Sequence, residues 1–211
     1  MSPIATLLLI TGLAAHLIAA VPTQPVIAPR GEAAAPAPVV DAVYDGSCYY
    51  PVPDAAFPED LSAYTGRWYQ LAGTPQIFTA ACACTYAEYG LTPNGTVSVE
   101  NVCQLPLGLR NAIAGEASPV APAYGARGTF QVRFPSVPGG GVTCPGPNYI
   151  VQKYGGDYAI VQAPAFDGFF LLSRAQHPPE EDVETWLAEA GSLGTNLAKV
   201  QRVSQENCQF T

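Results

Sequence analysis

Eight short runs of strand-like sequence, followed by one helical run, constrain the fold of this chain more than any other feature. Turn residues separate the runs, which cover residues 66–74, 85–91, 97–102, 112–119, 128–134, 149–154, 158–162 and 169–173. Short strands at regular spacing are typical of an antiparallel sandwich or a closed barrel. The sequence therefore predicts an all-β domain, with both architectures still open.

The strand pattern is clearest in two places. Residues 128–134 alternate strictly between apolar and polar side chains, which is typical of a strand with one buried and one solvated face. Between the second and third runs, Asn94-Gly95 favours a tight hairpin, because both residues tolerate the positive φ angles that such turns need. Neighbouring runs are therefore expected to pair antiparallel.

After the last strand run, the spacing of apolar residues changes to that of a helix. These residues recur at i, i+3, i+4 and i+7, as Val183, Trp186, Leu187 and Ala190. Three acids follow Pro178-Pro179, where they suit the positive end of a helix. We expect an amphipathic helix packed outside the sheet, ending near Gly191 and Gly194, and a short returning strand at 199–203.

Six segments between residues 48 and 208 read together as one pattern: Cys48-Tyr-Tyr-Pro-Val-Pro, Tyr64-Thr-Gly-Arg-Trp-Tyr-Gln-Leu, Cys84-Thr-Tyr-Ala-Glu-Tyr-Gly-Leu, Gly115-Glu-Ala-Ser-Pro, Phe170-Leu-Leu-Ser-Arg and Asn207-Cys208. Together these segments resemble the apolipoprotein D branch of the lipocalin family. The resemblance implies an eight-stranded antiparallel up-and-down barrel with one C-terminal helix packed outside. A β-sandwich would explain the strand spacing, but it gives no reason for Trp68, Arg174 and a single late helix.

The resemblance also implies structural roles for Trp68 and Arg174. An indole at the start of the first strand run closes the floor of the barrel, and a guanidinium after the last run stacks on its face from outside as a cation on a π system. We therefore expect Trp68 and Arg174 to form the barrel floor rather than contact a ligand.

The six cysteines predict disulfide bonds: Cys48, Cys82, Cys84, Cys103, Cys144 and Cys208. A zinc site is the alternative. It is disfavoured because His177 is the one histidine after residue 20, and because one residue rather than two to four separates the cysteines of Cys82-Ala83-Cys84. We expect three disulfides, no metal and no cofactor.

The pairing of these cysteines is only partly specified. The resemblance implies a bond between Cys84 and Cys208. The family also bonds its N-terminal cysteine to one in the seventh strand, but residues 158–162 contain none, so the partner of Cys48 stays open. Among the remaining pairings we favour Cys103 with Cys144, because both are expected at the same end of the barrel.

The N-terminal region predicts secretion. Residues 1–20 are apolar and end in small residues, which is typical of a signal peptide cleaved near Ala20, although a membrane anchor is the alternative. Residues 21–45 are rich in proline and alanine and predict a disordered leader, so the lipocalin-like domain would span 46–211. The sequon at Asn94 predicts glycosylation of an exposed turn.

The charge balance excludes one class of partner. Nine Lys and Arg against 17 Asp and Glu give a net charge of -8. Nucleic-acid binding needs a basic surface, and an anionic membrane would repel such a chain. We therefore expect neither partner.

The resemblance implies that the barrel binds a small hydrophobic molecule, such as a fatty acid, sterol, retinoid-like compound or pigment. The residues expected to face the ligand are Ala87, Tyr89, Phe130, Val132, Phe134, Phe170 and Leu172. Ordinary core packing is the alternative role for each of them. Tyr89 is expected to supply a single orienting hydrogen bond.

Two other functions remain as alternatives to a carrier. A lipocalin-type enzyme could use a thiol at Cys82 or Cys84, but a bonded sulfur is no nucleophile, and His177 has no nucleophile-elbow motif to serve. We predict that the chain is not an enzyme and has no catalytic residues. An interaction protein could instead use loops 104–111 and 135–147 to contact a lipid surface or a protein.

Overall fold

The computed structural model describes residues 38–76, 79, 81–136 and 144–210. Its strands are β1 (Ala42–Tyr44), β2 (Tyr49–Pro51), β3 (Gly66–Gly73), β4 (Ala83–Leu91), β5 (Val97–Leu105), β6 (Leu109–Pro119), β7 (Thr129–Arg133), β8 (Tyr149–Tyr154), β9 (Tyr158–Gln162), β10 (Phe169–Ser173) and β11 (Gln201–Arg202). One α-helix, α1, spans Glu180–Ser192 within these residues. Every predicted strand run therefore forms a strand, and the predicted helix is present.

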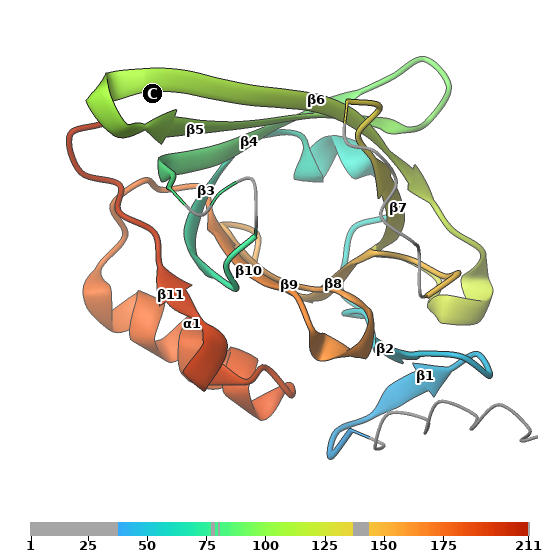
Figure 1. Ribbon diagram of the computed structural model, residues 1–211. Helices are drawn as coiled ribbons and strands as arrows, with labels where there is room; N and C mark the ends of the chain where they lie inside the picture. Colours follow the sequence, from blue (N-terminus) through green and yellow to red (C-terminus); the bar gives the residue numbers. More distant parts are fainter. Residues whose placement is uncertain (1–37, 77–78, 80, 137–143, 211) are drawn as a thin grey trace, which may run out of the picture. The chain divides into compact units, whose positions relative to one another are not determined.

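The main sheet closes on itself. Its strand order is β10-β9-β8-β7-β6-β5-β4-β3-β11, and β10 also pairs with β3. All these pairings are antiparallel, so β3 to β10 form a closed barrel of eight strands, with β11 as an extra strand outside (Figure 1). The predicted up-and-down barrel is confirmed, and the sandwich alternative is wrong.

The alternating strand directions give the barrel two different ends. The β4–β5, β6–β7 and β8–β9 connections lie at one end, together with the start of β3, and we call this the closed end. The β3–β4, β5–β6, β7–β8 and β9–β10 connections lie at the other, which we call the open end. Along any one strand, a side chain nearer a connection therefore lies nearer the end of the barrel to which that connection belongs.

The predicted hairpin at Asn94-Gly95 joins β4 to β5, but its geometry differs from expectation. Of these two residues, only Gly95 has a positive φ, at 77°. The turn is wider, because the amide of Thr92 donates to the carbonyl of Thr96 at 3.0 Å. Asn94 is exposed on this turn, where the sequon remains a predicted glycosylation site.

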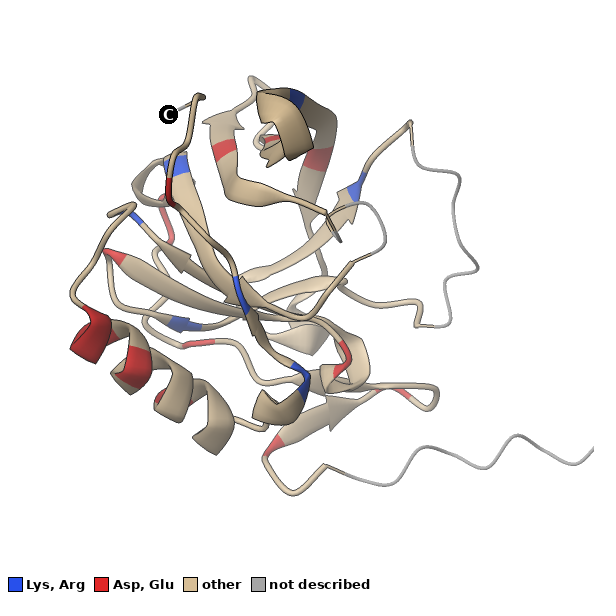
Figure 2. Ribbon diagram, turned by 60° about the vertical axis from the view of Figure 1, so that its left-hand side comes forward, with Lys and Arg blue, Asp and Glu red and all other residues tan. Residues whose placement is uncertain are grey.

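Helix α1 packs on the outer wall of the barrel through the predicted apolar face. Val183 and Ala190 are buried against a cluster that includes Ile160 and Leu171 from the sheet. The helix ends as expected before Gly194, which has a φ of 101°. Acidic residues, red in Figure 2, recur along α1, and two of them, Glu180 and Glu184, form ion pairs with Arg202.

A short N-terminal hairpin was not predicted. Strand β1 pairs with β2, although its residues belong to the expected disordered leader, so ordered structure begins before residue 46. Asp45 organises the turn by accepting hydrogen bonds from the amides of Ser47 and Cys48 and from the hydroxyl of Tyr50. The expected signal peptide, and the leader up to residue 37, lie outside the described residues.

All six cysteines form disulfides, which join Cys48 to Cys144, Cys82 to Cys103 and Cys84 to Cys208. The bond implied by the resemblance, Cys84–Cys208, is confirmed, but the favoured pairing of Cys103 with Cys144 is wrong. Both cysteines lie toward the open end, as expected, but they belong to different parts of its rim. Because β5 neighbours β4, Cys103 meets Cys82, whereas Cys144 lies near β8 and meets Cys48.

Candidate functional site

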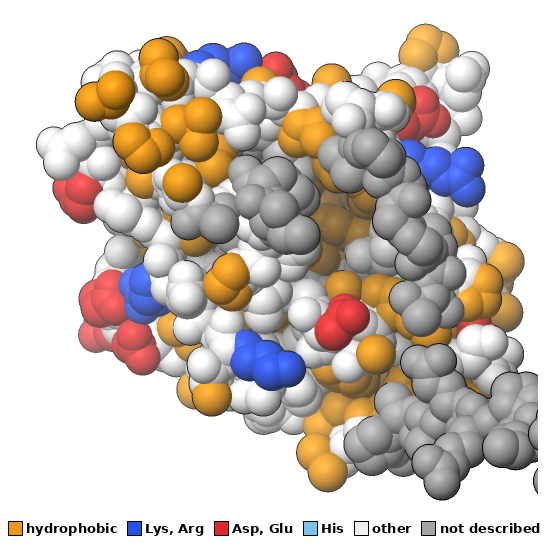
Figure 3. All heavy atoms as spheres, viewed as in Figure 1, with side chains coloured by type: hydrophobic (Ala, Val, Ile, Leu, Met, Phe, Trp, Pro, Cys, Tyr) orange, Lys and Arg blue, Asp and Glu red, His pale blue; other side chains and the backbone are white. Residues whose placement is uncertain are grey.

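The barrel encloses a cavity of about 380 Å³ that is lined largely by apolar and aromatic side chains. The space-filling view shows a hollow with hydrophobic side chains inside it (Figure 3). All seven residues expected to face a ligand line this cavity: Ala87, Tyr89, Phe130, Val132, Phe134, Phe170 and Leu172. Their contact with a ligand remains a prediction.

The floor at the closed end is built from Trp68 and Arg174. Trp68 is fully buried, and its indole N–H donates to the carbonyl of Tyr64 at 2.9 Å. The guanidinium carbon of Arg174 lies 3.8 Å from the centre of the indole, which is the stacking that the resemblance implied. Arg174 also donates to the carbonyls of Ala63 and Arg67, at 3.0 and 2.9 Å. Trp68 and Arg174 are not among the residues that line the cavity.

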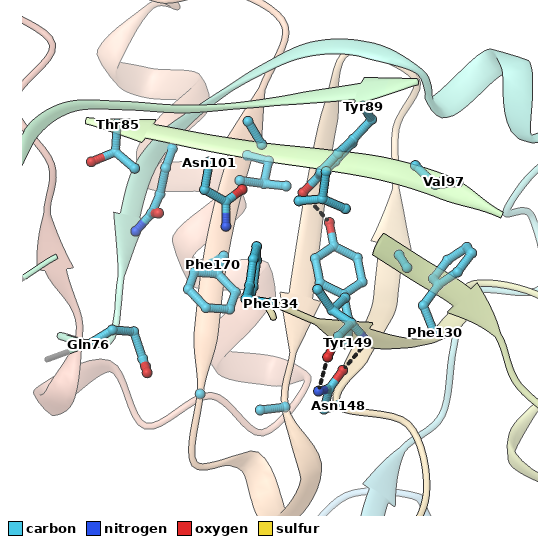
Figure 4. Close-up of a pocket in the computed structure, with 18 of the residues that line it drawn as sticks. Gln76, Thr85, Tyr89, Val97, Asn101, Phe130, Phe134, Asn148, Tyr149 and Phe170 are labelled. Atoms are coloured by element: carbon cyan, nitrogen blue, oxygen red, sulfur yellow. Dashed lines mark hydrogen bonds between the residues drawn. The ribbon is translucent and has the colours of Figure 1, made fainter. Parts of the chain in front are cut away.

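Three tyrosine hydroxyls meet inside the cavity, and we call Tyr64, Tyr89 and Tyr149 the tyrosine cluster. The hydroxyl of Tyr149 lies 2.8 Å from that of Tyr64 and 3.2 Å from that of Tyr89. Figure 4 shows Tyr89 reaching from β4 toward Tyr149 at the start of β8. The rings of Tyr64 and Tyr89 stack with their centres 5.6 Å apart.

Burial strengthens the preference of the tyrosine cluster for the uncharged state. Loss of water raises the pKa of Tyr89 to about 12, with opposing effects from the Tyr149 hydroxyl and from Arg174. Burial also raises the pKa of Tyr64 and of Tyr149 well above the ordinary value of 10.0. All three hydroxyls therefore keep their protons at neutral pH and can donate hydrogen bonds.

A polar band crosses three neighbouring strands nearer the open end, formed by Gln70, Thr85 and Asn101. Asn101 pairs with Ala87, and Trp68 pairs with the same residue. Gln70 and Thr85 each lie two residues further toward the open end, which is a rise of about 7 Å. All three side chains line the cavity, and none has a hydrogen-bond partner among the described residues. They can bind a polar group of a ligand.

The rim carries one charged side chain that faces the cavity. Asp167, in the β9–β10 connection, is the single ionisable acid or base among the described lining residues apart from tyrosines. Burial raises the pKa of its carboxyl group, and the nearby Lys199 opposes this effect. The side-chain amide of Asn148, also at the rim, accepts a hydrogen bond from the backbone N–H of Val132 and donates one to its carbonyl. Dashed lines mark hydrogen bonds of Asn148 in Figure 4.

Sequence reasoning missed the tyrosine cluster except for Tyr89. Tyr149 shares the inward face of β8 with Val151, so the two-residue period could have identified it. Tyr64 precedes β3 in a short 3-10 helix, Leu61–Tyr64, where no strand period applies. Its place in the cavity depends on tertiary packing alone.

The candidate residues for other chemistry are engaged elsewhere. Cys82 and Cys84 are both bonded, so neither is a thiolate nucleophile. His177 lies on the surface, where its Nδ1 atom is 3.7 Å from Oε1 of Glu206. At the open end, the turn between β5 and β6 leaves Leu107 almost fully exposed, and contacts of this rim remain a prediction. Among the described residues, no helix is long and apolar enough to cross a membrane.

Comparisons with known proteins agree with this architecture. Residues 59–205 match the family model of a lipocalin-like domain. Apolipoprotein D of Macaca fascicularis is 30% identical over 167 residues, covering 77% of this chain and 85% of the relative. Apolipoprotein D of Cavia porcellus is 31% identical over 178 residues, covering 79% of this chain and 87% of the relative.

Solved structures show the same fold at lower identity. Insecticyanin from the tobacco hornworm Manduca sexta superposes with a TM-score of 0.56 at 19% identity, covering 81% of this chain and 94% of that one. Lobster apocrustacyanin A1 superposes with a TM-score of 0.52 at 15% identity, covering 74% of this chain and 92% of that one. With the match to the family model and the apolipoprotein D relatives, these findings show that the chain belongs to the lipocalin family.

Proposed function

We propose that this lipocalin is a secreted carrier that binds one small hydrophobic molecule in its barrel and releases it unchanged. The observation that carries the proposal is the cavity of about 380 Å³ inside the barrel, which has a largely apolar lining. This volume lies toward the small end of the range of roughly 300 to 1,000 Å³ for ligand pockets, which suits a single compact molecule. The similarity to apolipoprotein D supports the same function.

Secretion is supported by three independent features of the chain. Residues 1–20 have the character of a signal peptide. Three disulfides need an oxidising compartment to form and persist. The sequon at Asn94 is exposed on a turn, where a secretory pathway could glycosylate it.

Expression in a secreting eukaryotic cell tests both parts of the proposal. The secreted protein is extracted with organic solvent, and the extract is analysed by mass spectrometry, while fluorescence titration measures binding of a panel of lipids and retinoid-like probes. We expect one class of apolar compound in the extract and one-to-one binding. Failure of every probe to bind would reject the carrier function, and recovery of chemically altered probe would indicate an enzyme.

A further inference from the structure

The tyrosine cluster has one more hydroxyl proton than there are hydrogen bonds between its three hydroxyls. Each hydroxyl carries one donor proton, so Tyr64, Tyr89 and Tyr149 together carry three. Two hydrogen bonds join the three hydroxyls, at 2.8 and 3.2 Å, and each uses one proton. Whichever hydroxyls donate within the cluster, one proton remains without an acceptor there.

No other described group accepts this proton. The three hydroxyls make no further hydrogen bond to the described part of the chain. Tyr64 is 4% exposed, and the three rings line a largely apolar cavity. An unused donor in such surroundings costs free energy that a suitably placed acceptor recovers.

The charges around the cavity define what kind of acceptor fits. Asp167 is negative when ionised, and no described lysine or arginine lines the cavity. The guanidinium of Arg174 is already stacked on Trp68 and bonded to two backbone carbonyls below the floor. A buried carboxylate on the ligand would therefore have no cationic partner, whereas a neutral oxygen needs none.

We propose that the free proton of the tyrosine cluster binds an oxygen of the ligand, so the cavity selects uncharged molecules that carry a carbonyl or similar acceptor oxygen at their inner end. This inference rests on the proposed carrier function and adds the chemical class and orientation of the cargo. The polar band of Gln70, Thr85 and Asn101 then faces the part of the ligand nearer the open end.

Three probes that share one ring system test the inference by isothermal titration calorimetry at pH 7. They are 2-ethylnaphthalene, which has no oxygen, 2-acetylnaphthalene, which has a neutral acceptor, and 2-naphthoate, which is an anion. One neutral hydrogen bond predicts that the ketone binds about three- to tenfold more tightly than the hydrocarbon. We expect the carboxylate to bind more weakly than the ketone.

The matched variant is Tyr64→Phe/Tyr89→Phe/Tyr149→Phe, which keeps all three rings and removes all three hydroxyls together. Replacing every partner of a hydrogen-bond network by apolar groups of the same shape is nearly neutral for folding. We expect this variant to bind both neutral probes with equal affinity. Tyr154→Phe is the control, because its hydroxyl donates to the carbonyl of Ala63 at 3.2 Å and does not line the cavity, so the ketone preference should persist.

The single variant Tyr89→Phe refines the expectation that Tyr89 alone orients the ligand. Tyr64 and Tyr149 keep two protons and one mutual hydrogen bond, so one proton still remains free. We therefore expect Tyr89→Phe to retain a preference for the ketone that the triple variant loses. Loss of the whole preference in Tyr89→Phe would assign the donor to Tyr89 and overturn the shared role of the cluster.

A second readout uses the native protein and does not depend on the folding of any variant. The infrared carbonyl stretch of bound 2-acetylnaphthalene should lie at lower frequency than in hexane, because a hydrogen bond weakens the C=O bond. A hexane-like frequency, or equal affinity of ketone and hydrocarbon for the native protein, would overturn this inference while leaving the carrier function intact. If neither neutral probe binds, the inference fails, whereas the carrier function is decided separately by the panel of lipids and retinoid-like probes.

Discussion

The two ends of the barrel are held together by different forces. At the closed end, aromatic rings pack on one another: Tyr64 lies 5.0 Å from Trp68 and 5.1 Å from Phe57, measured between ring centres. At the open end the links are covalent. Cys82 belongs to the β3–β4 connection, Cys84 to the start of β4, and Cys144 to the β7–β8 connection.

This difference follows from what each end has to do. A closed floor can be filled with side chains, so burial of apolar surface stabilises it directly. An open end that surrounds a cavity of about 380 Å³ leaves that volume unfilled by side chains. Disulfides restrict the unfolded chain instead, and they leave the interior free for a ligand.

The largest expected effect tests the covalent side of this comparison. The Cys84–Cys208 bond spans 124 residues and the Cys82–Cys103 bond spans 21. In the chain-entropy model, Cys84→Ala/Cys208→Ala should lower the free energy of unfolding by about 4 to 5 kcal/mol, and Cys82→Ala/Cys103→Ala by about 3 kcal/mol. Urea unfolding of both double variants measures the order, and a larger loss from the shorter loop would contradict it.

Trp68→Ala tests the packed floor, with an expected loss of about 3 to 5 kcal/mol from the cavity that it leaves. Trp186→Ala is the matched control, because that indole lies on α1 outside the barrel and stacks on Tyr158 with ring centres 4.6 Å apart. Trp186 is only partly buried, so its loss should cost less. An unchanged melting temperature for Trp68→Ala would show that the floor does not depend on the indole.

Arg174→Ala should have a smaller effect, about 1 to 2 kcal/mol, if the stacking on Trp68 is desolvated. Arg110→Ala is the control, since Arg110 is exposed and pairs with Glu100 at 2.9 Å. Thermal unfolding of both variants measures the difference. Equal melting temperatures for the two variants would mean that the stacked guanidinium adds nothing to the closed end.

The closed end could be predicted from the sequence more fully than the open end. Trp68 and Arg174 stand in local motifs, and their stacking follows from the closure of β3 on β10. The partner of Cys103 depends instead on its position around the rim of the barrel. The register of the β4–β5 pairing also shifts between Ala83 and Tyr86, close to Cys82 and Cys84. No strand period records such a shift, so the disulfide pairing could not be derived.

The cavity shows the same division between local and tertiary information. Alternation along the strands placed Phe130 and Val132 on the cavity side, because the period of two is fixed by the backbone. Tyr64 reaches the cavity from outside any strand, so its contact with Tyr149 had no signal in the sequence. The N-terminal hairpin was missed for a similar reason, since β1 and β2 are only three residues each.

The smallest expected effect on the free energy of unfolding comes from the ionisation of Asp167 at the rim. Burial raises the pKa of the three tyrosines of the cluster, which stay neutral, and it also raises the pKa of the Asp167 carboxyl group at the rim. A carboxyl with a raised pKa in the folded state contributes stability that is present below its unfolded pKa and lost as the pH rises through its folded pKa. At neutral pH, the ionised Asp167 therefore disfavours folding slightly.

Because Asp167 is exposed and solvent screens its charge, Asp167→Asn should raise the free energy of unfolding at pH 7 by less than about 0.5 kcal/mol and leave it unchanged near pH 3. Asp60→Asn is the control, with an expected change in the free energy of unfolding of opposite sign. Hydrogen bonds from Ser62 lower the pKa of the Asp60 carboxyl, so loss of this carboxylate should destabilise the protein at pH 7. Urea unfolding at both pH values separates the two. A lower stability of Asp167→Asn at pH 7 would mean that attraction to Lys199 outweighs the burial of the carboxylate, and that the rim, like the closed end, is stabilised by its charged group.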